Sequence, residues 1–412
     1  MRRVGRRIRS TRRAGAAALL AGLAVLFLCR AWARQSAGSS AQKESPTGAI
    51  GADFPRLDWQ PTRIPAGYRY LGDSVCAACH AAIARTQMVT PMGHASESVA
   101  DCAILRAHPR LSFHLGPYRW TITREGNASI YSVTDGKNTI TVPIAWAFGL
   151  GSAGQTYIFL RNGHYQESRV SFFNDTQGLD ITLGYPRTPP ATLEEAAGRP
   201  LGEQEAEACF GCHSTHAITA AGQLQAAALT PGVTCEGCHG PGSAHVAAVQ
   251  QGQIPFPKPG APPGPPPPGG YRIFNPGRLS AGDVADFCGS CHRSGVMVQL
   301  LHISGVLTVR FQPYRLELSA CFDPTDARIS CLACHDPHQD VVTDPSFYDA
   351  KCLACHRNRG GAPVTGANAP ACPVATRQCV TCHMPKFELP GAHFQFTDHY
   401  IRIVHPGDRY PG

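Results

Sequence analysis

Polar and apolar side chains alternate between about residues 111 and 185, as they do in a strand with one buried face. The clearest run has an apolar residue at every second position: Ile140, Val142, Ile144, Trp146 and Phe148. Further along, Tyr157–Leu160 and Tyr165–Phe173 flank the dipeptide Asn162-Gly163, which is typical of two-residue hairpin turns. The pattern predicts a small antiparallel sheet within 111–190, serving as a structural prop, as a module that docks a partner or as a lid over a cofactor.

The chain begins with a basic segment and a short apolar run, the pattern of an export signal. Seven arginines lie between residues 2 and 13, Ala14–Cys29 is apolar, and Ala31-Trp32-Ala33 resembles a cleavage site. We expect a signal peptide over residues 1–33 and therefore a periplasmic or otherwise exported, bacterial-type protein. The alternative is a retained membrane anchor, but its 16 apolar residues fall short of the roughly 20 that span a bilayer.

Composition narrows the class of protein. Among 412 residues there are 42 Gly and 35 Pro, and 16% of the side chains are charged, which argues against a coiled coil, a helical repeat and an acidic disordered chain. The formal charge of +8 suggests a nucleic-acid partner. Residues 1–33 hold eight arginines and no acid, however, so the mature chain has 29 basic and 29 acidic side chains. We therefore expect no nucleic-acid partner, and membrane association only if the signal segment is retained.

The cysteines carry the chemistry. Fourteen of the 18 fall into seven Cys-x-x-Cys-His motifs, numbered 1 to 7 in chain order: Cys76-Cys79-His80, Cys209-Cys212-His213, Cys235-Cys238-His239, Cys288-Cys291-His292, Cys331-Cys334-His335, Cys352-Cys355-His356 and Cys379-Cys382-His383. Two thiols three positions apart reach the two vinyl groups of one porphyrin, and the next histidine is the proximal ligand of its iron. Zinc sites and disulfides are the alternatives, but neither requires a histidine after every such pair. The sequence predicts seven covalently attached haem c groups.

The motifs lie close together along most of the chain. Successive motifs start 133, 26, 53, 43, 21 and 27 residues apart. The short intervals leave room for a helical turn or two and a loop, so neighbouring haems must pack against each other. The fold class that we expect is a mainly α and irregular, loop-rich multihaem cytochrome c fold with a small antiparallel β insertion.

The predicted division of the chain follows from these features. After the signal peptide come a flexible leader over 34–69, a first haem segment over 70–110, the β-rich insertion over 111–190, a six-haem region over 191–405 and a tail over 406–412. Residues 254–270 are Pro-rich and predict a stiff, extended loop. Of the mature cysteines outside the motifs, Cys102, Cys321 and Cys372, we expect the last two to form a disulfide.

Eleven histidines outside the motifs can supply the sixth, distal ligand of an iron. We expect distal ligands at His94, His216, His245, His338 and His399, with His393 and His302 as further candidates, and surface or sheet positions for His108, His114, His164 and His405. Two of these, His216 and His338, follow a proximal histidine by three positions. That tether is too short to reach the far side of the same haem, so each should serve a neighbouring haem. Methionine is scarce in the mature chain, so widespread His/Met ligation is not expected.

Four segments resemble periplasmic multihaem c-type cytochromes: Tyr70-Leu71-Gly72-Asp73-Ser74-Val75-Cys76, Gly232-Val233-Thr234-Cys235-Glu236-Gly237-Cys238-His239-Gly240-Pro241-Gly242, Cys334-His335-Asp336-Pro337-His338 and Cys382-His383-Met384-Pro385-Lys386. Over roughly 70–405 the chain is similar to the family of the tetrahaem electron acceptor of hydroxylamine oxidoreductase. The resemblance implies packed haem pairs, mostly bis-His iron and electron transfer, with distal roles for His94, His245, His338 and His399. The seven motifs exceed the four of the tetrahaem members, so that haem arrangement does not transfer whole.

Three functions fit this sequence. The first is an electron carrier between redox partners, the second an oxidoreductase acting on a small nitrogen compound at one five-coordinate haem, and the third a haem-bearing scaffold of a larger redox complex. The Cys-x-x-Cys-Lys motif of multihaem nitrite reductases does not occur, so we favour the carrier over a catalyst and assign no catalytic residue. Seven haems with their propionates add about −7 when oxidised and about −14 when reduced, so redox partner proteins should dock through basic surfaces.

Overall fold

Residues 67–219, 222–255, 267–356 and 372–411 are described by a computed structural model. All of them belong to one unit, Gly48–Gly412. The predicted signal peptide, most of the predicted leader and residues 256–266 of the Pro-rich segment lie outside these ranges. No helix among the described residues is both long and apolar enough to cross a membrane.

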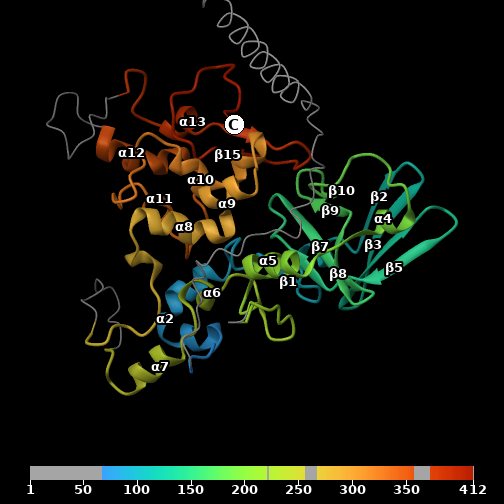
Figure 1. Ribbon diagram of the computed structural model, residues 1–412, viewed down its shortest axis with the longest axis horizontal. Coiled ribbons are helices and arrows are strands. Elements are labelled where there is room, and N and C mark those ends of the chain that lie inside the picture. The colour runs from blue at the N-terminus through green and yellow to red at the C-terminus, as the bar shows by residue number, and fades with distance from the viewer. Residues whose placement is uncertain (1–66, 220–221, 256–266, 357–371, 412) are drawn as a thin grey trace, which may run out of the picture. The chain divides into compact units, whose positions relative to one another are not determined.

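The first sheet is an antiparallel meander with the strand order β2-β3-β4-β5 (Figure 1). Its strands are β2 (Arg110–Leu115), β3 (Tyr118–Glu125), β4 (Ala128–Thr134) and β5 (Thr139–Pro143). Gly126 and Gly136 lie in the turns with φ of 58° and 89°, a conformation that glycine adopts without steric cost. Burial follows the alternation of the sequence: Trp120 and Ile122, two positions apart on β3, both face the interior.

The second sheet has the strand order β1-β6-β7-β8-β11, and β9 pairs with both β7 and β10. Its strands are β1 (Ser96–Ser98), β6 (Trp146–Phe148), β7 (Gly154–Arg161), β8 (His164–Ser168), β9 (Val170–Phe173), β10 (Gly178–Ile181) and β11 (Gly198–Pro200), and all of their pairings are antiparallel. Asn162 and Gly163 turn the β7–β8 hairpin with φ of 54° and 79°. Because β1 and β11 lie outside 111–190, this sheet includes strands from both sides of the predicted insertion.

One run of alternating residues is divided between the two sheets. Strand β5 ends at Pro143, whose nitrogen has no proton to continue the ladder, and β6 begins three residues later. Between them the Ile144 amide donates to Ser129 O at 2.9 Å, and the Ala145 amide donates to Ile158 O at 2.8 Å. The chain therefore passes from the first sheet to the second within two residues.

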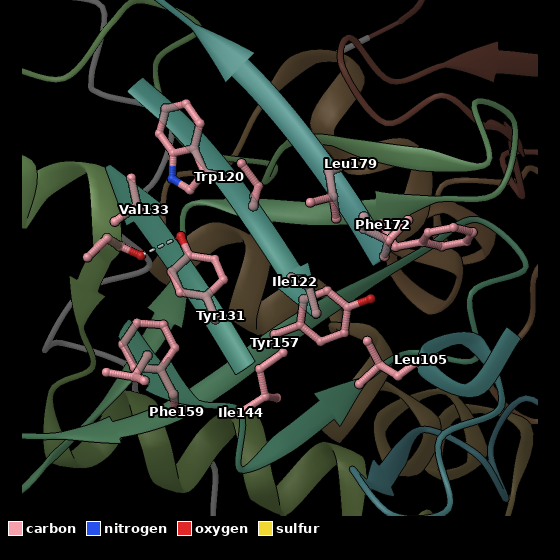
Figure 2. Packing of buried hydrophobic residues seen from close by; sticks show 14 of the residues in the cluster. Leu105, Trp120, Ile122, Tyr131, Val133, Ile144, Tyr157, Phe159, Phe172 and Leu179 are labelled. Carbon is pink, nitrogen blue, oxygen red and sulfur yellow. Dashed lines mark hydrogen bonds between the residues drawn. The ribbon is translucent and has the colours of Figure 1, made fainter. Parts of the chain in front are cut away.

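The apolar core contains side chains from both sheets. Figure 2 shows Trp120, Tyr131 and Phe159 in this interior, and the last two rings stack with their centres 5.3 Å apart. The helix α4 (Leu193–Ala197) supplies acceptors for the polar ends of two buried rings. Trp120 Nε1 donates to Ala196 O and the Tyr131 hydroxyl donates to Ala197 O, both at 2.7 Å. These bonds offset the cost of burying polar atoms.

The rest of the described chain consists of short helices, two small sheets and the loops and turns that join them (Figure 1). The helices that carry a motif are α2 (Asp73–Gln87), α5 (Glu203–His213), α6 (Cys235–His239), α8 (Ala281–His292), α11 (Cys331–Cys334), α12 (Asp349–His356) and α13 (Cys379–His383). The others are α3 (Ala103–Ala107), α7 (Ser243–Gln250), α9 (Gly295–Leu300), α10 (Gln312–Glu317), η1 (Pro276–Arg278), η2 (Gly305–Arg310) and η3 (Pro345–Tyr348), with the two-stranded sheets β12 (Ser214–Thr215)–β13 (Thr230–Pro231) and β14 (Lys386–Glu388)–β15 (Gln395–Thr397).

Candidate haem-binding cavity

The seven motifs line one continuous cavity of about 5120 Å³. Every motif cysteine and every proximal histidine contributes to its wall except Cys209. A site for one small ligand usually measures about 300–1,000 Å³, so this cavity has room for several porphyrin-sized groups. Among the described residues, no three or more Cys, His, Asp or Glu side chains converge so that they could hold a metal ion alone. The donor set is paired thiols with single imidazoles, which fits haem c because the porphyrin brings its own four nitrogen ligands.

Helical geometry explains the motif spacing. In every motif the two cysteines lie on one helix, and positions i, i+3 and i+4 of a helix share a face. Serine side chains begin two of these helices: Ser280 Oγ accepts from the Asp283 amide at 3.1 Å in α8, and Ser330 Oγ accepts from the Ala333 amide at 3.2 Å in α11. The two thiols of each motif therefore lie on one side of their helix, and the imidazole joins them where the helix continues through the histidine. In motif 5, His335 instead follows α11 in an extended conformation.

Backbone carbonyls fix the orientation of five imidazoles. The Nδ1 atoms of His213, His239, His245, His383 and His399 lie 2.8, 2.9, 2.8, 2.8 and 3.0 Å from the carbonyl oxygens of Ala95, Phe274, Tyr271, Arg402 and Thr397. A carbonyl oxygen only accepts hydrogen bonds, so Nδ1 carries the proton and donates. The other nitrogen, Nε2, then keeps its lone pair and is the atom able to bind a metal.

Three proximal histidines each face a histidine from outside the motifs. The ring centres are 6.5 Å apart for His80 and His245, 6.1 Å for His239 and His338, and 6.2 Å for His335 and His399. A metal–imidazole bond is about 2.0–2.1 Å and a ring centre lies roughly 1.1 Å beyond the nitrogen, so rings on opposite sides of one metal have centres about 6.2 Å apart. The observed separations match this value.

Desolvation favours the neutral form of six histidines that line the cavity. It is the first cause of a lowered pKa at His80, His213, His239, His292 and His335. Burial also lowers the pKa of His399 to about 4. A histidine binds metal only in its neutral form, so these side chains are in the ligand form at neutral pH.

Two other expected distal ligands have different surroundings. His216 lines the cavity and stacks on Tyr70 with ring centres 4.0 Å apart. His94 does not line the cavity, although Met92 and Ala95 beside it do. The His94 side chain is partly exposed, and its Nδ1 lies 2.9 Å from a carboxylate oxygen of Glu97. The distal roles of His94 and His216 therefore stay predictions.

The remaining candidates separate into two groups. His302 is exposed and His393 Nε2 donates to Asp180 of β10 at 2.7 Å, and neither lines the cavity. His405, which the sequence suggests is a surface or sheet residue, is exposed but does line the cavity.

The expected disulfide is not formed, because Cys321 and Cys372 are both free thiols.

Two aspartates, which the sequence analysis missed, join pairs of motifs. Asp73 Oδ1 accepts from the amide of Cys235 at 3.2 Å, and Asp349 accepts from the amides of Gln378 and Cys379 at 2.8 and 2.9 Å. Each aspartate lies three residues before the first cysteine of its own motif. Each bonds to the first cysteine of another motif, so the same contact links motif 1 to motif 3 and motif 6 to motif 7. This shared Asp-x-x-Cys spacing is the signal that could have identified them.

A buried glutamate strengthens the first of these links. The carboxylate of Glu236, inside motif 3, accepts from the amides of Leu71, Gly72 and Gly242 at 2.8–3.0 Å. Glu236 is 2% exposed. The segment before motif 1 and the turn that leads to His245 are thus bound to the same carboxylate, which brings His245 opposite His80.

Further contacts bring other pairs of motifs close together. The thiol of Cys212 in motif 2 donates to Ser290 O in motif 4 at 3.7 Å, and the motif-bearing helices α8 and α11 pack together. Burial and then Cys291 raise the pKa of Cys238, which places motif 3 near motif 4. Burial and then Cys352 raise the pKa of Cys334, which places motif 5 near motif 6. Every motif therefore has at least one other motif beside it.

A comparison with protein families is consistent with this geometry. Residues 189–240, which contain motifs 2 and 3, match the family described as cytochrome c554 and c-prime. The match supports a c-type cytochrome in electron transfer, and this class implies covalently bound haem c. No curated protein and no solved structure matches the chain.

Proposed function

We propose that this protein is a periplasmic heptahaem c-type cytochrome that transfers electrons between redox partner proteins. The observation that carries the proposal is the shared cavity, whose wall contains residues of all seven motifs. Bound haem c supplies an iron that takes up and releases one electron. The paired thiols hold that group covalently, and the imidazoles hold the iron. The fold is then a loop-rich multihaem cytochrome c fold with an antiparallel β insertion.

Three haems, at motifs 1, 3 and 5, are bis-His in this proposal. The supporting pairs are His80 with His245, His239 with His338 and His335 with His399. Bis-His ligation gives lower potentials than His/Met ligation, because the Met thioether raises the potential of a haem. The carbonyls that accept from Nδ1 increase the electron density on the ligand and tune each site further.

The contacts between motifs suggest the route of the electrons. Motif 1 adjoins motif 3 through Asp73, motif 3 adjoins motifs 4 and 5, motif 5 adjoins motif 6, and motif 6 adjoins motif 7 through Asp349. Motif 2 joins this series at motif 4, through Cys212. We infer a path with motifs 1 and 7 at its ends and motif 2 as a side branch.

A second candidate function is catalysis at an open haem. All 18 histidines lie among the described residues, and five of the eleven outside the motifs line the cavity: His216, His245, His338, His399 and His405. Seven irons need seven distal ligands to be fully His-ligated. At least two irons therefore lack a cavity-lining distal histidine. An iron that is not bound by Met92, Met297 or Met384 of the cavity wall either would be open to a small nitrogen compound.

One experiment separates the two candidates. Electron paramagnetic resonance of the oxidised holoprotein, followed by stepwise reduction, counts low-spin and high-spin irons. The carrier proposal expects all seven irons to exchange electrons with a soluble mediator and to leave the spectrum unchanged when nitric oxide or hydroxylamine is added. A high-spin iron that binds either molecule would favour catalysis, and irons that do not exchange electrons would contradict the carrier.

A further inference from the structure

Three charged side chains meet beside motif 7. Arg315 of α10 donates from Nε and Nη2 to the two carboxylate oxygens of Asp398, at 2.8 and 3.0 Å. Arg402 donates from Nη1 to Asp398 Oδ2 at 2.7 Å. Tyr400 lies against both guanidinium groups, 5.3 and 4.9 Å from its ring centre. The cluster is deeply buried, since the side chains of Arg315, Asp398 and Arg402 are 1%, 0% and 15% exposed.

The charges in this cluster do not balance. Two guanidinium groups share one carboxylate, which leaves one positive charge among the described residues that form the cluster. Arg315 donates to Asp398 and to Pro411 O, whereas Nη2 of Arg402 is buried without a hydrogen-bond partner in the described part of the chain. An uncompensated buried charge is strongly unfavourable. An anion at Arg402 would remove that penalty.

The position of Arg402 indicates which anion fits. Arg402 lines the cavity, and its backbone is bonded in both directions to the proximal histidine of motif 7. Its amide donates to His383 O at 3.3 Å, and its carbonyl accepts from His383 Nδ1 at 2.8 Å. Each haem carries two carboxylates on its propionate groups, and a guanidinium group pairs with a carboxylate through two parallel hydrogen bonds.

We propose that Arg402 binds a propionate carboxylate of a haem at this end of the cavity, while Asp398 and Arg315 hold the Arg402 side chain in position. The proposal rests on the proposed function, because it requires attached haem. A fixed positive charge near an iron disfavours its ferric form, so Arg402 raises the reduction potential of the haem that it binds. Arg402 is thus a positioning and tuning residue rather than a catalytic one.

The test is a redox titration of full-length holoprotein carrying Arg402→Gln. One of the seven titration components should move to lower potential, by about tenfold in its equilibrium constant for reduction or about 59 mV for one electron, while the haem count is unchanged. The matched control is Arg409→Gln, which removes the same charge from an exposed position on the same segment. Seven unshifted components, or the same shift in the control, would overturn the proposal. A wild-type protein without seven components would instead contradict the proposed function.

A second variant covers the case in which Arg402→Gln does not accumulate. Arg402→Lys keeps the charge and loses the two-pronged geometry, so it should change the carboxylate bands in the redox-difference infrared spectrum of the same haem. Bands identical to those of the wild type would overturn the proposal. Inorganic phosphate is the probe for a free anion at Arg402. A potential of the wild-type protein that depends on phosphate concentration would assign the site to a free anion and also overturn it.

Discussion

The imidazole rings of His239 and His338 lie parallel to within 3°, with their centres 6.1 Å apart. His239 belongs to motif 3, and His338 follows motif 5 by three residues. His338 therefore faces a ring from another motif and not the one beside it in sequence. In our proposal this pair binds one iron from both sides and ties two haems together.

Removing His338 tests that assignment. We expect His338→Ala to convert one low-spin iron to high spin, because the iron at motif 3 loses its distal imidazole. Electron paramagnetic resonance and the visible spectrum report this change. His164→Ala is the matched control, since His164 is exposed on β8 and does not line the cavity. An unchanged spectrum for His338→Ala, or an equal change in the control, would exclude this ligand pair.

Two buried tyrosines of the core should respond differently to loss of the hydroxyl. The Tyr131 hydroxyl donates to Ala197 O, whereas the Tyr157 hydroxyl has no hydrogen-bond partner in the described residues. Tyr131→Phe should lower the free energy of unfolding by about 0.5–1.5 kcal/mol, and Tyr157→Phe should leave it equal or higher. Thermal unfolding followed by circular dichroism compares the two. Equal losses in both variants would show that this hydrogen bond does not set the difference.

Glu167 predicts a dependence of stability on pH. Burial raises the pKa of this carboxyl to about 7, although Arg199, which donates to it at 3.1 Å, acts in the opposite direction. A carboxyl with a raised folded-state pKa stabilises the fold while it is protonated, and this stability is lost as the pH rises from about 4.5 to about 7. Glu167→Gln stays neutral and should be more stable than the wild type at pH 8, by up to about 3 kcal/mol.

Melting temperatures at pH 4.5 and pH 8 check this prediction. Wild type and Glu167→Gln should melt alike at the lower pH and diverge at the higher one. Glu205 also accepts from Arg199, at 2.8 and 2.6 Å, so the arginine keeps a hydrogen-bond partner in both proteins. A constant difference across the pH range would refute the assignment of the effect to Glu167.

For the buried Asp398 we expect a pH dependence of stability with the opposite sign to that of Glu167. Burial opposes its ionisation, but hydrogen bonds from Arg315 and then the Tyr400 amide outweigh burial and hold the pKa of Asp398 below its usual value. The stability that it contributes is therefore present above about pH 3.8 and is lost as the pH falls through the lowered pKa. Asp398→Asn should destabilise the protein by about 3–5 kcal/mol at neutral pH, since it removes the carboxylate that the guanidinium groups of Arg315 and Arg402 share.

An exposed aspartate supplies the control for that variant. Asp175 is exposed and lies between β9 and β10, so Asp175→Asn should change the melting temperature little. Chemical denaturation at pH 7 measures both variants. A loss below about 1 kcal/mol for Asp398→Asn would mean that the cluster is not a buried ion network.

Local patterns predict local geometry well in this chain. The Asn162-Gly163 dipeptide predicts a hairpin, and both residues have positive φ at that turn. The alternation from Ile140 to Phe148 predicts extended chain but not its division at Pro143, because alternation reports which face is buried and not which sheet receives it. Likewise, nothing in 111–190 predicts that β1 and β11 complete the second sheet, since those pairings join segments far apart in the sequence.

The cavity, too, could be predicted from the sequence only where local spacing determines it. Covalent chemistry requires the Cys-x-x-Cys-His spacing, so the motifs are visible from sequence alone. The facing pairs depend on tertiary contacts such as that of Glu236 with Leu71, and no spacing encodes them. A count of histidines does not show which of them reach the cavity. His393, for example, donates to Asp180 of the β region. His405 shows the reverse, since tertiary structure brings this residue, which follows β15, to the cavity wall.

In our proposal one chain binds seven haems covalently. The most direct measurement is the intact mass of the exported protein, together with a haem assay of the same sample. We predict a mature chain that begins after Ala33 and carries seven haem c groups, with every motif cysteine in a thioether bond. Fewer than seven haems, or motif cysteines found as zinc ligands or disulfides, would contradict the account.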